Sequence, residues 1–94
     1  MTYISGPMTG IKDWNFPEFY KAQEFLTSRG DKVFNPAQNS LECGFERSDF
    51  LRLDIQALLL CDKIYMLFGW GNSSGAILEK SIAEALGYEV EYQV

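Results

Sequence analysis

The hydrophobic and polar positions along the chain predict four strands that alternate with three helices. Short apolar runs bounded by glycine, proline or polar residues are typical of strands, and they lie at Thr2–Ser5, Lys32–Asn35, Asp62–Phe68 and Tyr88–Gln93. Between these runs apolar residues recur every three or four positions, which predicts helices that begin near Asn15 and span about Ser48–Cys61 and Ser74–Leu86. The polar segment Ala37–Phe45 predicts an irregular loop.

Residues at the expected helix ends support these bounds. Asn15 is a candidate N-cap of the first helix, and Pro17 suits its first turn. Gly30 and Gly87 are typical of residues that end a helix, because glycine readily adopts the left-handed conformation there. Together these signals predict where the first helix starts and where the first and third helices stop.

The β-α-β-α-β-α-β order predicts the fold class. Alternation of this kind, without a repeat or a linker, is typical of one α/β domain, here residues 1–94. We expect a small doubly wound parallel sheet in the strand order 2-1-3-4, with helices on both faces. Ligands of such sheets bind beyond the carboxyl ends of the strands, where the strand order reverses. The loops Ser5–Gly10 and Gly69–Gly75 leave the sheet at that point.

The loop Ser5–Gly10 is the first candidate ligand-binding segment. Gly6 and Gly10 allow a tight turn and close approach of the backbone to a ligand, and Ser5 and Thr9 add hydroxyl groups. The loop matches neither a dinucleotide-binding fingerprint nor a phosphate-binding P-loop. A simple turn is the alternative interpretation.

Two carboxylates fall on the apolar faces of predicted helices. Glu79 shares a face with Ala83, and Asp54 shares one with Leu58. A carboxylate on an inner face is costly unless it is paired or used in chemistry. For Glu79 the alternative is a side chain at the edge of that face that reaches solvent, and for Asp54 it is a satisfied structural group.

Aromatic and hydroxyl residues in the loops add further candidates. Trp14 and Trp70 lie in the loops near the point of strand reversal, where an indole can stack on a nucleobase or simply cover the core. Ser73 and Ser74 are candidate caps of the third helix, and with its free N–H groups they can also hold a phosphate.

Composition excludes several classes of function. The net charge is −5 and the eight Lys and Arg residues are scattered, which argues against a nucleic acid polymer as partner. There is no histidine, and Cys43 and Cys61 are not spaced as metal ligands, so we expect neither a metal site nor a cofactor. The longest apolar stretch, Ala57–Cys61, is too short to span a membrane, and no signal peptide is evident, so a cytoplasmic location is expected.

These residues permit glycosyl chemistry. A carboxylate such as Glu79 can attack an anomeric carbon, and a second acid such as Asp54 can protonate the leaving base if burial raises its pKa. Tyr3 lies on the first strand, close to the candidate loop. The alternative is a non-catalytic module that binds a nucleotide or a protein partner in the same crevice.

The chain resembles a known family along nearly its whole length. The matching segments are Tyr3–Gly10, Asn15–Pro17, Asn35–Pro36, Cys61–Asp62, Gly69–Trp70 and Ser74–Glu79. They resemble the DUF4406 family of small bacterial and phage proteins, which is similar to the nucleoside 2-deoxyribosyltransferases and deoxynucleoside-monophosphate N-glycosidases. That similarity implies a flavodoxin-like fold, a nucleoside or nucleotide substrate, and either transferase or hydrolase activity.

The resemblance also implies a role for individual residues. Glu79 would be the nucleophile, Asp54 would act as an acid or orient the sugar, and Tyr3 would orient the nucleophile. The remaining candidates would bind substrate, and they are Ser5, Gly6, Pro7, Met8, Gly10, Trp70, Ser73, Ser74 and Gly75. A sheet this small leaves apolar helix faces and strand edges uncovered, so we expect a homodimer.

Overall fold

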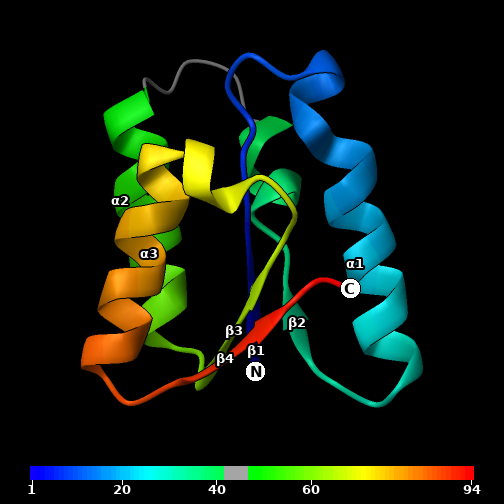
Figure 1. The fold of residues 1–94 in the computed structure, drawn as a ribbon, viewed down its shortest axis with the longest axis vertical. Helices are drawn as coiled ribbons and strands as arrows, with labels where there is room; N and C mark the ends of the chain where they lie inside the picture. The colour runs from blue at the N-terminus through cyan, green and yellow to red at the C-terminus, as the bar shows by residue number, and fades with distance from the viewer. Residues whose placement is uncertain (42–46) are drawn as a thin grey trace.

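The computed structural model describes residues 1–41 and 47–94, with side chains omitted from 39 to 50. A central sheet is covered by one helix on one face and by two on the other (Figure 1). The strands and helices are β1 (Thr2–Ser5), α1 (Phe16–Ser28), β2 (Val33–Phe34), α2 (Arg47–Leu59), β3 (Lys63–Met66), α3 (Ser74–Ala85) and β4 (Glu89–Tyr92). Short 3-10 helices lie at Lys12–Asn15 (η1), Pro36–Leu41 (η2) and Trp70–Asn72 (η3).

The sheet has the predicted topology. Its strands are all parallel and follow the order β2-β1-β3-β4, as expected for a doubly wound α/β fold. In the central pair Thr2 lies opposite Lys63 and Ser5 opposite Met66. None of the described helices is long and apolar enough to cross a membrane.

β1 has the predicted bounds, whereas the other three strands are shorter than the apolar runs that predicted them. The run Asp62–Phe68 contains the strand Lys63–Met66 only. Leu67 still donates its backbone N–H to the Ser5 carbonyl oxygen at 2.8 Å, but Phe68 already lies at the surface, with 64% of the residue exposed. An apolar residue at the end of a run can therefore belong to the loop that follows.

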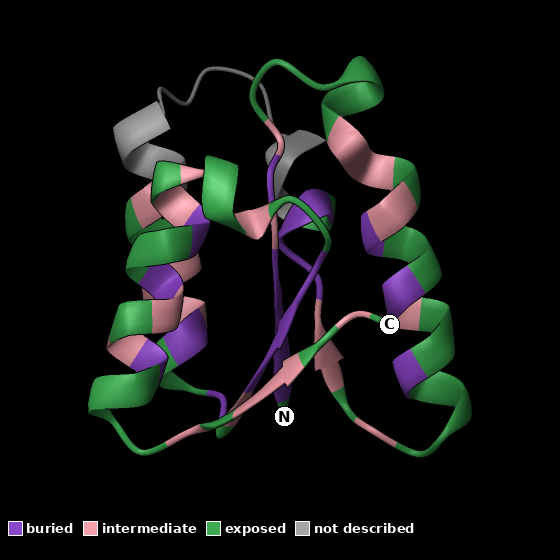
Figure 2. Cartoon of the chain, viewed as in Figure 1, coloured by how far each residue is buried: buried purple, intermediate pink, exposed green. Residues whose placement is uncertain are grey.

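Alternate residues of the central strands pack into two separate cores, one on each face of the sheet (Figure 2). On the α2/α3 face the core includes Tyr3, Ile64 and Met66. On the α1 face it includes Ile4 and Leu67, which pack with buried residues of α1. The direction in which a strand residue points thus decides which helices it meets.

Two local predictions hold only in part. Asn15 occupies the N-cap position of α1, as predicted, but its side chain forms no capping hydrogen bond, and its backbone adopts a left-handed conformation with φ of 61°. Asp13 and Trp14 before it also have positive φ, of 55° each, so the turn that enters α1 is unlike a standard N-cap. The expected irregular loop from Ala37 begins instead with η2, and its residues 42–46 lie outside the described part.

The other predicted helix ends are confirmed. The Ser73 hydroxyl accepts the Ala76 backbone N–H at 3.2 Å and caps α3. Gly30 follows α1 with φ of +97° and Gly87 follows α3 with φ of +80°. Those two angles favour glycine, which explains why the helices end there.

Candidate active site

Glu79 is buried on the inner face of α3. Only 6% of the residue is exposed, and the buried residues of the same helix are Ala76 and Ala83. These two alanines lie three residues before and four after Glu79, so they share its face. Their small side chains let α3 approach the sheet closely, and the longer glutamate side chain reaches β1. The alternative in which Glu79 reaches bulk solvent is therefore wrong.

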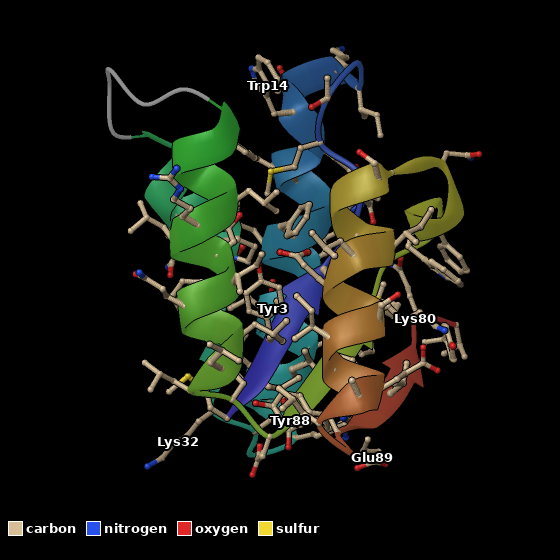
Figure 3. The ribbon with its side chains drawn as sticks, turned by 90° about the vertical axis from the view of Figure 1, so that its left-hand side faces the viewer. Tyr3, Trp14, Lys32, Lys80, Tyr88 and Glu89 are labelled. Carbon is tan, nitrogen blue, oxygen red and sulfur yellow. The ribbon has the colours of Figure 1, made fainter. Side chains whose placement is uncertain are left out.

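Two hydroxyl groups of β1 hold the Glu79 carboxylate. The Tyr3 hydroxyl donates to Oε2 at 2.5 Å, and the Ser5 hydroxyl donates to Oε1 at 2.7 Å. Both donors are fully buried, and they face the same side of the sheet because they are two positions apart on one strand. Figure 3 shows Tyr3 between α2 and α3, at the centre of this face. Each carboxylate oxygen thus receives one hydrogen bond from a fixed direction.

Burial, neighbouring charges and hydrogen bonds shift the pKa values of the three titratable groups of the site. Burial raises the pKa of Glu79 above its usual value, while the hydrogen bonds from Tyr3 and Ser5 act in the opposite direction. Burial and then the Glu79 charge raise the pKa of Asp54 to about 7. Burial, together with the charges of Glu79 and Asp54, raises the pKa of Tyr3 well above its usual value. Tyr3 therefore remains a hydrogen-bond donor at all physiological pH values.

Asp54 is the predicted partner carboxylate, and it lies on α2 with its side chain half-buried. α2 and α3 cover the same face of the sheet (Figure 1), and the charge of Glu79 contributes to the raised pKa of Asp54. In the described part of the chain, no group of three or more acidic or cysteine side chains is arranged to hold a metal ion.

The loop after β1 touches the loop after β3. A Cβ atom on Gly6 would lie 2.8 Å from the Cβ of Leu67, which is closer than side chains tolerate. A Cβ on Gly69 would lie 3.3 Å from Cγ of Pro7. Gly6 is therefore required for close packing of the two loops at the carboxyl edge of the sheet. Gly10 has a different requirement, a φ of +81°.

The predicted substrate-binding residues of this loop divide between the two faces. Ser5 turns toward Glu79, and it is buried rather than open to a ligand. Pro7 is also buried, and Met8 packs against the core on the α1 face. The structure thus brings only the first part of Ser5–Gly10 to the carboxylates.

The two tryptophans are in different environments. Trp70 is half-buried against the core of the α2/α3 face, with the Tyr92 ring 6.0 Å away and Lys80 Nζ 5.1 Å from the Trp70 ring centroid. Trp14 is 58% exposed in η1 (Figure 3), at the end of the molecule opposite the N-terminus that is marked in Figure 1. Trp70 thus covers the core, which was the alternative to stacking on a nucleobase. Trp14 projects from the surface.

The N-terminus of α3 lies one and a half turns before Glu79. Ser73 is engaged there as the cap, and Ser74 is exposed. A Cβ atom on Gly75 would lie 4.0 Å from Ser73 Oγ, which is an ordinary van der Waals contact. Free N–H groups at a helix start favour anions. Binding of a phosphate by Ser73–Gly75 stays a prediction.

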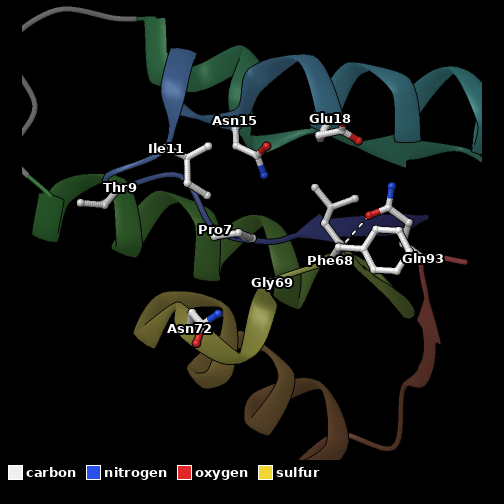
Figure 4. A pocket seen from close by; sticks show the side chains of 10 residues that line it. Pro7, Thr9, Ile11, Asn15, Glu18, Phe68, Gly69, Asn72 and Gln93 are labelled. Atoms are coloured by element: carbon white, nitrogen blue, oxygen red, sulfur yellow. Dashed lines mark hydrogen bonds between the residues drawn. The ribbon is translucent and has the colours of Figure 1, made fainter.

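Sequence reasoning missed a groove on the α1 face, with a volume of about 660 Å³ (Figure 4). Pro7, Thr9, Gly69 and Asn72 belong to the two predicted loops, but the rest of the lining comes from other segments, namely Ile11, Asn15, Glu18, Leu67, Phe68 and Gln93. The available signal in the sequence was a set of polar residues close to the two predicted loops, namely Asn15 and Glu18 after the first and Asn72 within the second. Only the fold shows that these segments meet.

Comparison with known proteins identifies the family and no activity. No curated protein matches the chain. The model of one protein family, described as a domain of unknown function, matches residues 1–92. This match covers both central strands, the hydroxyl groups of β1 and Glu79. The chain therefore belongs to the DUF4406 family, as its sequence motifs predicted.

Proposed function

We propose that the protein cleaves or exchanges the N-glycosidic bond of a deoxynucleoside or its monophosphate, with Glu79 as the nucleophile. The observation that supports this most strongly is the carboxylate of Glu79, buried and held by Tyr3 and Ser5. Burying an ionisable group is costly, and such a cost is typical of a functional site. The resemblance to deoxyribosyltransferases and N-glycosidases supports the same residue roles.

The proposed reaction has two steps. A Glu79 oxygen forms a bond to the anomeric carbon while the bond from that carbon to the base nitrogen breaks, and Asp54 gives its proton to the leaving base. With a pKa of about 7, Asp54 carries that proton in a large share of molecules at neutral pH. Water or a second base then attacks the anomeric carbon and gives a proton to Asp54. The bond between that carbon and the Glu79 oxygen breaks, which releases Glu79.

The hydrogen bonds to Glu79 serve this reaction by orienting it. Each carboxylate oxygen has a second lone pair beside the one used by Tyr3 or Ser5, so an oxygen remains able to attack. A fixed carboxylate needs little reorganisation on the way to the transition state. Ser5 therefore acts as a positioning residue in this proposal, in place of the substrate contact expected from its sequence position.

The experiment incubates the purified chain with the four common deoxynucleosides and with their monophosphates, and follows free base by chromatography. We expect base release from at least one substrate and a loss of at least about 1,000-fold in Glu79→Gln. Glu84→Gln is the matched control, because Glu84 is exposed on the same helix. No release by the wild type, or equal release by Glu79→Gln, contradicts the proposal.

The second candidate function is nucleotide binding without turnover. The complete burial of Tyr3 and Ser5 favours it, because a hydrogen-bond network with a purely structural role also requires a carboxylate that is enclosed by its donors. A thermal-shift series with the same nucleotides separates the two candidates. Stabilisation without base release supports binding alone.

We also propose a homodimer that works in the cytoplasm, where free deoxynucleotides are found. Apolar side chains on the outer surfaces of α2 and α3 support the dimer, since Leu53, Ile77 and Leu78 are 38%, 43% and 40% exposed. Light scattering of the purified chain, compared with Ile77→Glu, tests it. A monomeric mass for the wild type at micromolar concentration contradicts it.

A further inference from the structure

The groove on the α1 face is separate from the carboxylates. Glu79 bonds to Tyr3, which packs in the core beneath α2 and α3. Leu67 lines the groove and packs in the opposite core, beneath α1. Pro7 and Gly69 both line the groove, from the loops that follow β1 and β3. Apart from Pro7, to which the family resemblance gives a substrate-binding role, a ligand in the groove would use residues to which the proposed glycosyl chemistry assigns no role.

The polar residues of the groove are amides and one carboxylate. Glu18 has 42% of its side chain exposed, and its only ion-pair partner among the described residues is Lys21, at 3.4 Å. Asn15 is not used as a cap, so its side-chain amide is left to line the groove. Asn72 contributes a second amide from η3. No Lys or Arg occurs among the described lining residues, which makes a phosphate a poor occupant.

Gln93 contributes a third amide, and the fold fixes its direction. Its Oε1 accepts the Phe68 backbone N–H at 2.8 Å. Figure 4 shows the amide nitrogen turned away from that bond, toward the side of the groove formed by Glu18. A side-chain amide with its oxygen already bonded presents two N–H donors beside an acidic acceptor.

The remaining lining is apolar and partly aromatic. Phe68 is 64% exposed, although the other residues of its apolar run are mostly buried. Pro7 and Ile11 add apolar surface opposite it (Figure 4). An exposed ring beside amide and carboxylate groups is suited to a flat ligand that stacks and forms hydrogen bonds along its edge.

We propose that this groove binds an uncharged planar heterocycle that carries an amino group, such as free adenine or cytosine. Asparagine and glutamine side chains pair with the donor and acceptor edge of adenine, and a carboxylate accepts from the amino group of cytosine. The volume of about 660 Å³ lies within the range of small-molecule sites. Glu18 is the charged residue among the described lining residues, and its carboxylate accepts hydrogen bonds. The groove therefore favours ligands that are rich in N–H donors.

The test titrates adenine into the ¹⁵N-labelled full chain and follows the side-chain amide signals of Asn15, Asn72 and Gln93. We expect these signals to shift together, at millimolar adenine or below. Purine, which lacks the amino group, and uracil, which presents carbonyl oxygens, are expected to bind at least about ten-fold more weakly. Agmatine serves as the probe for a cationic occupant.

Variants separate this site from the proposed active site. Glu18→Gln is expected to weaken adenine binding about ten-fold, because it removes a charge-assisted hydrogen bond. Glu24→Gln, an exposed change on the same helix, is the matched control and leaves binding unchanged. Glu79→Gln keeps adenine binding in the groove whether or not it abolishes base release.

Three outcomes overturn the proposal. The first is no shift of the three amide signals at the solubility limit of adenine, and the second is tighter binding of agmatine than of adenine. The third is a set of shifts confined to Ser73–Glu79, which would place the base at the carboxylates. Unchanged adenine affinity in Glu18→Gln, with a wild-type spectrum elsewhere, likewise contradicts the role given to this residue.

Discussion

The two faces of the sheet are built from the same strands and differ sharply in what they bury. Under α2 and α3, β1 places Tyr3 and Ser5 against a buried carboxylate. Under α1, the same strand places Ile4 in a core that is mainly apolar, although it also contains Tyr65. One face therefore buries a carboxylate together with its hydrogen-bond donors, while the other gains its stability chiefly from apolar burial.

This difference explains how so small a chain tolerates a buried acidic group. A carboxylate removed from water destabilises the folded state unless hydrogen bonds compensate for its lost hydration. Glu79 has two such bonds, and the apolar core beneath α1 is unaffected by its charge. Substitutions on the two faces should consequently have different effects, and the four changes below test this from the largest expected effect to the smallest.

Phe19→Ala probes the apolar face. Phe19 is fully buried in the core beneath α1, and its removal leaves a cavity. We expect the free energy of unfolding to fall by roughly 3–5 kcal/mol, measured by urea denaturation. Base release per folded molecule should stay unchanged, and a parallel loss of activity in the folded fraction would show that the faces are coupled.

Tyr3→Phe and Tyr65→Phe form a matched pair across the sheet. Both tyrosines are buried on adjacent strands, but they face opposite cores. Of the two tyrosines, Tyr3 is the one that donates to Glu79, so Tyr3→Phe is expected to slow base release about 100-fold. Tyr65→Phe is expected to leave the rate within a factor of two or so of the wild type. Equal rates in the two variants would remove Tyr3 from the mechanism.

Gly6→Ala tests the contact between the two loops at the carboxyl edge. The added methyl group would meet Leu67 at 2.8 Å, so the loop after β1 must move. We expect a loss of about 1–3 kcal/mol in the free energy of unfolding, measured by thermal denaturation. Gly71→Ala is the control, because no atom lies within 4 Å of the added Cβ. Equal stability of both variants would contradict the close packing.

Asp54→Asn tests the titration of the polar face. The pKa of Asp54 is about 7 in the folded protein and about 4 in the unfolded chain, so the folded state favours the protonated form. Stability from this group is therefore present at low pH and falls as the pH rises from about 4 through 7. The wild type should lose roughly 1–2 kcal/mol more than Asp54→Asn between pH 5 and pH 8. Parallel pH profiles would place Asp54 in contact with water.

The sequence predicted the fold well because its signals are local. Apolar runs, glycine stops and the Ser73 cap act within a few residues, and they led to the correct strand order. Asn15 occupies the predicted N-cap position but forms no side-chain capping bond, because three consecutive left-handed residues in the turn into α1 override its usual preference. Local rules therefore described the elements better than the junctions between them.

The candidate site was only partly predictable, for a different reason. The helical spacing placed Glu79 on an inner face but left its burial undecided, because periodicity alone does not reveal a partner. Its partners Tyr3 and Ser5 lie 76 and 74 positions away in the sequence. The groove is harder still, since Glu18 and Gln93 come from opposite ends of the chain. Groups brought together by topology carry no shared local signal.

The hydrogen bond from Tyr3 to Glu79 gives the protein an internal reporter. A hydroxyl proton is normally invisible to NMR because it exchanges with water, whereas a buried one in a 2.5 Å hydrogen bond is protected and resonates far downfield. Its frequency depends on the charge of the acceptor. A single proton signal can therefore report when Glu79 changes its ionisation or becomes covalently occupied, without a label on the ligand.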